Sequence, residues 1–165
     1  MFERKEIVMK NDFLEIKKWE KEDQVYYYAE RRGVDSVAFV LQDKKTGKVG
    51  LISEFKPPID KFVVTAFGGS LDKDLSHEEI VKEEVLEEAG YEGVSLSYAG
   101  SAFVSTQMNQ WCHLYLVDVT HAQEVGRRPQ TKLEEIATVE WMWPAQVKSL
   151  FCWKAITILT KMGVI

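Results

Sequence analysis

Long apolar runs and an excess of positive charge are both missing from this sequence of 165 residues. A membrane-spanning helix needs roughly 20 consecutive apolar residues, and no stretch reaches that length. The N-terminal residues MFERKEIVMKNDF lack the apolar core of a secretory signal peptide. The formal net charge is −5, whereas a surface that binds nucleic acid usually carries clustered lysine and arginine. We therefore expect a cytoplasmic protein that binds neither membranes nor nucleic acid.

Cysteine is scarce as well, since the sequence has only Cys112 and Cys152, both in apolar segments. One disulfide is formally possible, but two buried reduced thiols are expected because nothing requires an oxidising compartment. The sequence also has no repeats, low-complexity segments or linker-like stretches. Because 45% of the residues are hydrophobic, we expect residues 1–165 to form a single domain with a substantial core.

The most informative segment is residues 69–91, GSLDKDLSHEEIVKEEVLEEAGY. Glu84, Glu87 and Glu88 have the spacing i, i+3 and i+4, which places them on one face of a helix. Like charges so close together repel one another unless a cation lies between them. A hard divalent ion such as Mg²⁺ suits these oxygen ligands. The alternative interpretation, a solvated acidic face on a surface helix, stays open at this point.

Local signals define where this helix begins and ends. Ser76 is a good N-cap, and Glu79 three residues later completes a capping box. Gly90 lies where a C-terminal stop is expected. Phe67 ends an apolar run and is followed by Gly68 and Gly69, which predicts a strand leading into a glycine loop where the backbone approaches a ligand.

The remaining pattern predicts an α/β fold, with strands before and after this helix and a second helix at the end. We expect an antiparallel meander in residues 1–31 and a mixed sheet built from later strands. The predicted strands are residues 5–9, 12–19, 24–30, 34–41, 49–55, 62–67, 94–99, 102–105, 111–119 and 136–143. Residues 120–134 are expected to form a long loop, and the last helix to run from Pro144 to about Lys161.

The segment resembles the Nudix box, G-x5-E-x7-R-E-U-x-E-E-x-G-U, in which U is a bulky apolar residue. The matching residues are Gly69, Glu84, Val85, Glu87, Glu88, Gly90 and Tyr91. The resemblance implies a Nudix-type α/β/α sandwich with a mixed sheet and an N-terminal antiparallel meander. Leu75 replaces the first glutamate of the pattern, and Glu83 replaces its arginine. Glu83 adds a negative charge beside the carboxylates, so we predict weakened metal binding or reduced turnover.

Most of the chain resembles the ADP-ribose pyrophosphatase branch, including the meander and the segments LISEFKPP and EEIATVEWMWP. That resemblance implies a homodimer formed through residues 1–31. It also implies a Mg²⁺-dependent hydrolase, with Mn²⁺ as a possible substitute, that cleaves the diphosphate linkage of a nucleotide such as ADP-ribose. The alternatives are a nucleoside triphosphate pyrophosphohydrolase and a degenerate Nudix domain that binds nucleotide without efficient hydrolysis.

The resemblance also assigns residues. The metal ligands are expected to be Gly68, through its carbonyl oxygen, and Glu84, Glu87 and Glu88. The catalytic residues are expected to be Glu84, Glu88 and Glu135, with Glu134 as the alternative to Glu135, because an attacking water needs an acceptor within reach. Lys56, Gly69 and Arg128 are expected to contact the small-molecule substrate. For Lys56, Arg128 and the two loop glutamates, plain solvent exposure is the competing interpretation.

Overall fold

The computed structural model describes residues 3–31 and 35–165. Its first half contains the strands β1 (Glu3–Lys10), β2 (Glu15–Lys21), β3 (Gln24–Glu30), β4 (Ser36–Asp43), β5 (Lys48–Lys56), β6 (Lys61–Thr65) and β7 (Phe67–Ser70), with a short 3₁₀ turn at Pro57–Ile59. The second half contains α1 (His77–Glu84), the π-helical turn η2 (Val85–Ala89), β8 (Tyr91–Glu92), β9 (Ser95–Ser105), β10 (Met108–Asp118), β11 (Gln123–Glu124), α2 (Lys132–Glu135), β12 (Thr138–Met142), α3 (Pro144–Val147) and α4 (Trp153–Lys161).

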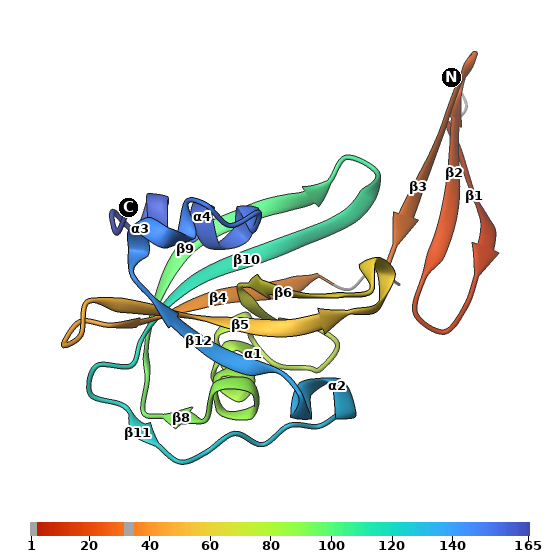
Figure 1. Ribbon diagram of the computed structural model, residues 1–165. Helices are drawn as coiled ribbons and strands as arrows, with labels where there is room; N and C mark the ends of the chain where they lie inside the picture. Colours follow the sequence, from red (N-terminus) through yellow and green to blue (C-terminus); the bar gives the residue numbers. More distant parts are fainter. Residues whose placement is uncertain (1–2, 32–34) are drawn as a thin grey trace.

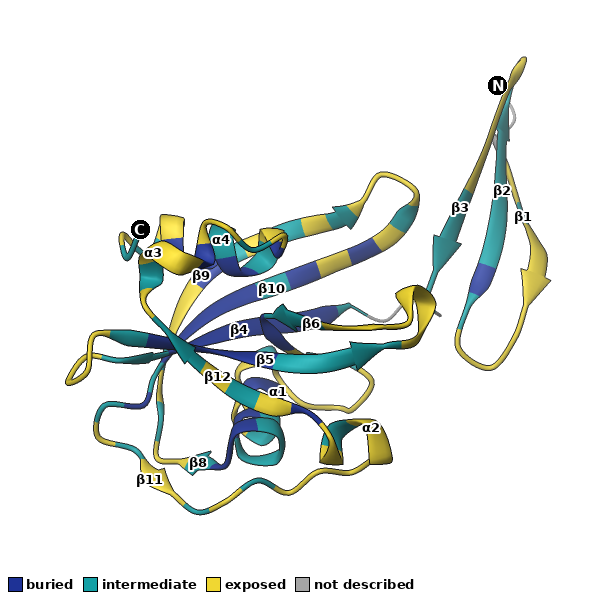
Figure 2. Cartoon of the chain, in the orientation of Figure 1, coloured by how far each residue is buried: buried dark blue, intermediate teal, exposed yellow. Residues whose placement is uncertain are grey.

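In the described residues, the main sheet has ten strands in the order β1-β2-β3-β10-β4-β5-β12, with β6 paired to β5, β7 to β4 and β9 to β10. It is mixed, because β10 runs parallel to β3 and β4 while the other pairs are antiparallel. Buried residues concentrate in the central strands β4 and β10 (Figure 2). The predicted mixed sheet is confirmed.

Two apolar clusters lie on the two faces of this sheet. Alternate residues of β4 divide between them, Ala38 and Val40 facing one cluster and Phe39 and Leu41 the other. The first cluster contains the buried residues of α4, and the second contains those of α1. Figure 1 shows these helices on opposite sides of the sheet. This arrangement confirms the predicted α/β/α sandwich.

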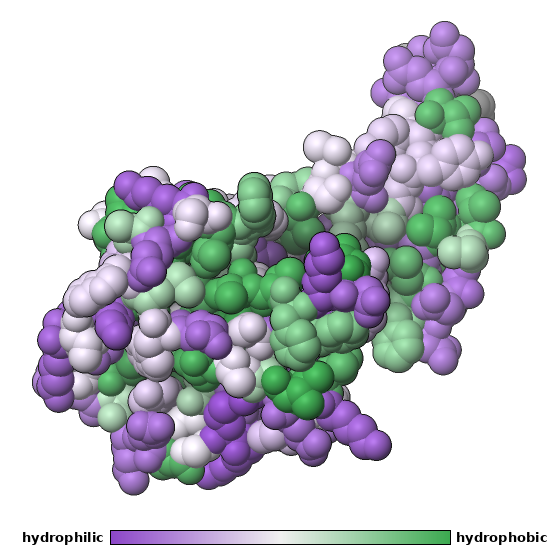
Figure 3. All heavy atoms as spheres, in the orientation of Figure 1, coloured by the Kyte–Doolittle hydropathy of each residue, from purple (hydrophilic) through white to green (hydrophobic). Residues whose placement is uncertain are grey.

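The three strands β1, β2 and β3 form the expected antiparallel meander, which projects from the rest of the domain as an arm (Figure 1). It is joined to the β9–β10 hairpin by hydrogen bonds from Ala29 N to Gln107 O and from Tyr26 Oη to Thr106 O, each 2.8 Å long. Large hydrophobic side chains remain exposed on the arm, where Figure 3 shows some green areas. These side chains are Ile7, Val8, Met9, Phe13, Val25, Tyr26 and Tyr27.

The helix that carries the glutamates begins where the sequence predicts. Ser76 Oγ accepts a hydrogen bond from Glu79 N, and the Glu79 side chain accepts one from Ser76 N, which completes the capping box. Gly90 ends the helical segment with φ of 78°. The last turn, Val85–Ala89, is π-helical rather than α-helical. A local widening of this kind often accompanies a functional site.

Gly68 and Gly69 were predicted to lie in a loop, and this is wrong. Both belong to β7, where they pair with Ala38 and Val37 of β4. The strand continues through the glycines because β4 supplies hydrogen-bonding partners along its edge. The loop that precedes α1 therefore starts only after Ser70.

Several other boundaries differ from the prediction. Residues 94–99 and 102–105 merge into the single strand β9, and the long loop contains β11 and α2. Strand 12–19 begins only at Glu15, because Asn11 Oδ1 accepts hydrogen bonds from the next turn of backbone. Val34, the predicted start of strand 34–41, lies outside the described residues.

The predicted final helix divides into α3 and α4. Gln146 O accepts hydrogen bonds from Ser149 Oγ at 2.7 Å and Ser149 N at 3.1 Å, and Leu150 N bonds to Val147 O, so the α-helical pattern of bonds stops here. The chain then turns, and Cys152 becomes the N-cap residue of α4. In the described part of the chain every helix is too short or too polar to cross a bilayer. Both cysteines are buried free thiols, as expected.

Candidate active site

A cavity of about 310 Å³ opens beside β7 and brings together residues from most of the chain. Of the predicted site residues, Lys56, Gly68, Gly69 and Glu88 line it. Charged and polar side chains that the sequence did not single out also line it, namely Arg31, Ser36, Glu54, Thr65, Ser70, Gln110 and Lys154. The cavity is therefore polar, with cations and carboxylates on its wall.

Close packing holds the box glutamates against β7. A Cβ atom placed on Gly69 would lie 2.1 Å from Glu84 Oε1, so the Glu84 carboxylate occupies the space of the missing side chain. A Cβ on Gly68 would lie 2.8 Å from the Val37 carbonyl oxygen. Gly68 N donates a hydrogen bond of 3.3 Å to Glu88 Oε2. The missing side chain of Gly69 thus makes room for the Glu84 carboxylate, and the backbone N of Gly68 binds that of Glu88.

These two carboxylates resist ionisation. Burial, and then repulsion from Glu87 and Glu134, raises the pKa of Glu84 to about 7. Burial, and then repulsion from Glu84, raises the pKa of Glu88 to about 8 against the opposing hydrogen bond from Gly68. Glu88 lines the cavity, whereas Glu84 packs behind it against Gly69 and does not line it. A cation bound beside the two carboxylates would stabilise the charged forms of both.

The residues present fit a hard divalent ion, although not as a closed cage. Within residues 3–31 and 35–165, no group of three or more His, Cys, Asp or Glu side chains converges as a set of metal ligands. Glu84 and Glu88 would hold the ion with oxygen atoms, and Glu87 contributes negative charge nearby. This suits Mg²⁺, which usually keeps several waters and takes one or two protein carboxylates together with substrate phosphates.

Glu83, which replaces the arginine of the box, has a partner. Lys73 Nζ lies 2.6 Å from Glu83 Oε2, so the loop before α1 supplies a cation to the helix. The negative charges of Glu87 and Glu84 also act on Lys73. The Glu83 charge is thus partly offset, which the sequence did not indicate. Both side chains are about half exposed, at 54% and 41%, so the pair contributes little to stability.

Arg128, a predicted substrate contact, does not line this cavity. Its side chain lies 3.5 Å from Glu92 Oε1, and its backbone N donates a hydrogen bond of 2.9 Å to Glu87 O. The neighbouring Arg127 donates hydrogen bonds to the carbonyl oxygens of Glu134 and Ala137. These two arginines therefore join the long loop to the box helix and to α2.

The structure distinguishes between the two glutamates of that loop. Glu134 raises the pKa of both Glu84 and Glu88, so its charge lies close to the carboxylate pair. Glu135 is exposed to solvent. The oxygens of Glu134 accept hydrogen bonds from Gln130 N and Thr131 Oγ1 at 2.6 and 2.9 Å. Glu54 of β5, which sequence reasoning missed, also raises the pKa of Glu88 and lines the cavity.

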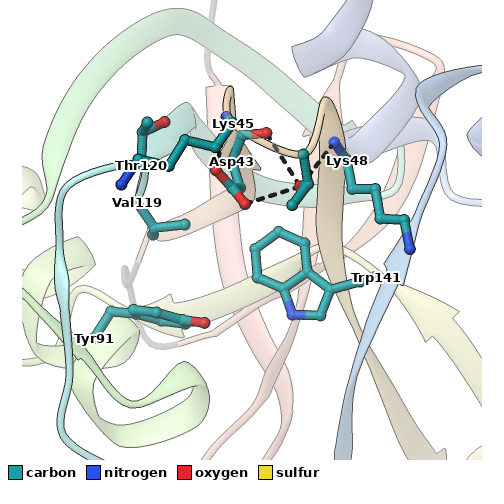
Figure 4. A pocket seen from close by; sticks show the side chains of 8 residues that line it. Asp43, Lys45, Lys48, Tyr91, Val119, Thr120 and Trp141 are labelled. Carbon is teal, nitrogen blue, oxygen red and sulfur yellow. Dashed lines mark hydrogen bonds between the residues drawn. The ribbon is translucent and has the colours of Figure 1, made fainter.

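A second cavity, of about 450 Å³, lies at the other end of β4 and β5 (Figure 4). Tyr91 and Trp141 form aromatic walls in it, and Asp43, Lys45 and Lys48 lie in the adjoining hairpin (Figure 4). No box glutamate lines it. Although it is larger, we therefore assign the candidate active site to the cavity beside β7.

Comparison with known proteins identifies the family. The family model described as NUDIX domain matches residues 31–159, which is most of the chain. This chain belongs to the NUDIX family. The match covers the box helix, every residue that lines the cavity and most of α4, so the family fold carries the cavity of this NUDIX protein.

A solved structure titled "Crystal structure of ADP compounds hydrolase" has the same fold as this NUDIX protein. The two superpose with a TM-score of 0.77 at 14% sequence identity, over 97% of this chain and 90% of that chain. No curated protein sequence matches the chain. At that identity the structural likeness establishes the fold, including the N-terminal arm, and leaves the reaction to be inferred from the site.

Proposed function

We propose that this NUDIX protein is a Mg²⁺-dependent hydrolase that cleaves the diphosphate linkage of a nucleoside diphosphate derivative. The observation that carries the proposal is the pair Glu84 and Glu88, two carboxylates with raised pKa values against the glycines of β7. Cationic side chains on the same cavity wall complement a phosphorylated ligand. The family match supports a small nucleotide derivative as the substrate. ADP-ribose or a related sugar nucleotide is the best single candidate.

Each residue would have a distinct role. Bound Mg²⁺, or Mn²⁺ in its place, would offset charge on the phosphate oxygens and activate water. Glu84 and Glu88 would hold the ion, and the Gly68 carbonyl oxygen and Glu87 are further candidate ligands. Glu134 would accept a proton from the attacking water. Lys56 would contact the substrate, although it now pairs with Glu54 at 2.6 Å.

A substrate panel tests this proposal. The purified protein is incubated with Mg²⁺ and, separately, ADP-ribose, other sugar nucleotides, dinucleotides and nucleoside triphosphates, and products are identified by chromatography. Nucleoside monophosphate from a sugar nucleotide, lost in Glu88→Gln, is the expected result. Pyrophosphate release from triphosphates would support the alternative substrate class instead. Binding without turnover of any member would contradict hydrolysis and support a degenerate binding domain.

We further propose that the protein acts in the cytoplasm as a homodimer formed through the N-terminal arm. Val25 and Tyr27, alternate residues of β3, are 52% and 53% exposed, which suits a protein interface better than a solvated surface. In sedimentation velocity the double variant Val25→Glu/Tyr27→Glu is expected to be monomeric, while Gln24→Glu stays dimeric. A wild-type protein that is monomeric at all concentrations would contradict this proposal.

A further inference from the structure

We propose that Lys154 and Gln110 form an anion-binding subsite that takes a phosphate group of the ligand, so that the C-terminal helix contributes directly to the active site. Lys154 is the second residue of α4, and Gln110 belongs to β10. Both line the cavity that Glu88 lines. The inference deepens the proposed function, since it names how the cavity recognises the phosphates of its substrate.

Gln110 is the first observation. Its side chain is only 4% exposed, yet it lines the cavity, and it makes no side-chain hydrogen bond with any residue that the structure describes. Among the described residues Arg127 Nε alone is a fully buried side-chain nitrogen or oxygen without a partner, so the amide of Gln110 keeps some exposed surface, which faces the cavity that the residue lines. An amide NH₂ can donate two hydrogen bonds. A ligand oxygen in the cavity would supply the missing acceptor.

Lys154 is the second observation, and it differs from the other two cations of the cavity. Lys56 pairs with Glu54 at 2.6 Å, and Arg31 Nη2 donates a hydrogen bond of 3.0 Å to Ser70 Oγ. Lys154 forms no ion pair with a carboxylate among the described residues. Its three ammonium donors therefore remain available to an anion, as a point charge suited to phosphate.

Contacts made by Cys152, two residues earlier, fix the position of Lys154. Cys152 Sγ lies 3.1 Å from Thr65 Oγ1 and accepts a hydrogen bond of 3.3 Å from Ala66 N. Both partners belong to the segment that passes from β6 into β7, and both line the cavity. This contact anchors the start of α4 beside the cavity, where the positive end of the helix dipole adds to the charge of Lys154.

The two helical layers meet at this cavity. Glu88 comes from the helical segment on one face of the sheet, and Lys154 comes from α4 on the other face. A ligand with two linked phosphates could therefore place one phosphate toward the carboxylates and the other toward Lys154 and Gln110. The subsite thus favours diphosphates over monophosphates.

Binding of inorganic pyrophosphate without metal tests the subsite separately from turnover. Calorimetry in EDTA compares wild type with Lys154→Met and Gln110→Met, with the exposed Lys148→Met as the matched control. We expect each cavity variant to lose affinity about tenfold, which corresponds to one charge-assisted hydrogen bond of about 1.4 kcal/mol. Lys154→Arg is expected to retain binding, and thermal melting verifies that every variant folds.

The outcomes separate the two proposals. Loss of pyrophosphate affinity in Lys154→Met but not Lys148→Met supports the subsite, even if the wild type hydrolyses nothing and the proposed function fails. Equal affinities in Lys154→Met, Gln110→Met and Lys148→Met would overturn the subsite, even if the wild type is an active hydrolase. Where a substrate is turned over, Lys154→Met should raise KM about tenfold with a smaller change in kcat. The reason is that the lysine would bind the phosphate in the ground state as well as in the transition state.

Discussion

The carboxylate of Glu84 occupies the space that a side chain at Gly69 would need. Its Oε1 atom lies 2.1 Å from the point where a Cβ atom of residue 69 would be. This contact links the box helix to β7 and sets the depth at which the carboxylate is buried. It also explains why a glycine is needed inside a strand, where that residue is otherwise unfavourable. The candidate metal site therefore depends on a strand residue as much as on the helix.

Gly69→Ala should impair the site without unfolding the protein. The new methyl group would displace the Glu84 carboxylate, so we expect Mg²⁺ affinity to fall by about tenfold or more and hydrolysis by about 100-fold. Gly50→Ala is the matched control, because its Cβ meets Leu41 and Trp141 at 3.2 and 3.3 Å and no box residue. Unchanged affinity and rate in Gly69→Ala would show that the contact is unimportant.

The metal-free protein should lose stability as the pH rises. The folded pKa values of about 7 for Glu84 and about 8 for Glu88 exceed the ordinary value of 4.5, so folding opposes their ionisation. Stability is therefore greatest below pH 4.5 as far as these groups are concerned, and it declines as pH rises from 4.5 through 8. Since one unit of pKa shift corresponds to about 1.4 kcal/mol, we expect the decline, measured by urea unfolding in EDTA, to reach several kcal/mol.

Added Mg²⁺ should oppose this decline, and its stabilising effect should be larger at pH 8 than at pH 6 because ionised carboxylates bind the ion. The double variant Glu84→Gln/Glu88→Gln should show neither the decline nor the response to Mg²⁺. If the wild type and this variant have the same pH profile in EDTA, the two glutamates are not the destabilising groups.

The ion pair between Lys73 and Glu83 should be weak but measurable. Both side chains are about half exposed, so a double-mutant cycle of Lys73→Gln and Glu83→Gln is expected to give a small favourable coupling that weakens as salt is added. The charge-reversed variant Lys73→Glu/Glu83→Lys should recover most of that stability. A coupling of zero would mean that the loop before α1 leaves Glu83 as an uncompensated fourth charge beside the metal site.

Local chemistry made the box helix predictable. Ser76 and Gly90 act through hydrogen bonds and backbone conformation within a few residues, so the sequence alone locates both ends. Local chemistry also explains the missed break in the last helix. The prediction rested on Pro144 as the first residue of the helix and did not weigh Ser149, whose side chain can bind a helical carbonyl.

The cavity could not be predicted in the same way. Glu54 and Lys154 are separated by most of the chain and meet only after β5, β7 and α4 have assembled around β4. Nothing in the sequence around Lys154, the second residue of α4, indicates that it will line this cavity. Gln110 offered one hint, a polar residue just before the apolar strand 111–119, yet its burial depends on how β9 and β10 pair.

The most direct test of the account is a calorimetric titration of Mg²⁺ into wild type and Glu84→Gln/Glu88→Gln in the presence of ADP-ribose, followed by assay of the same samples for nucleoside monophosphate. Glu78→Gln, an exposed change in the first turn of α1, is the control. The account predicts metal binding and product in the wild type and the control, with both absent from the double variant. Metal binding of equal strength in all three proteins would contradict it.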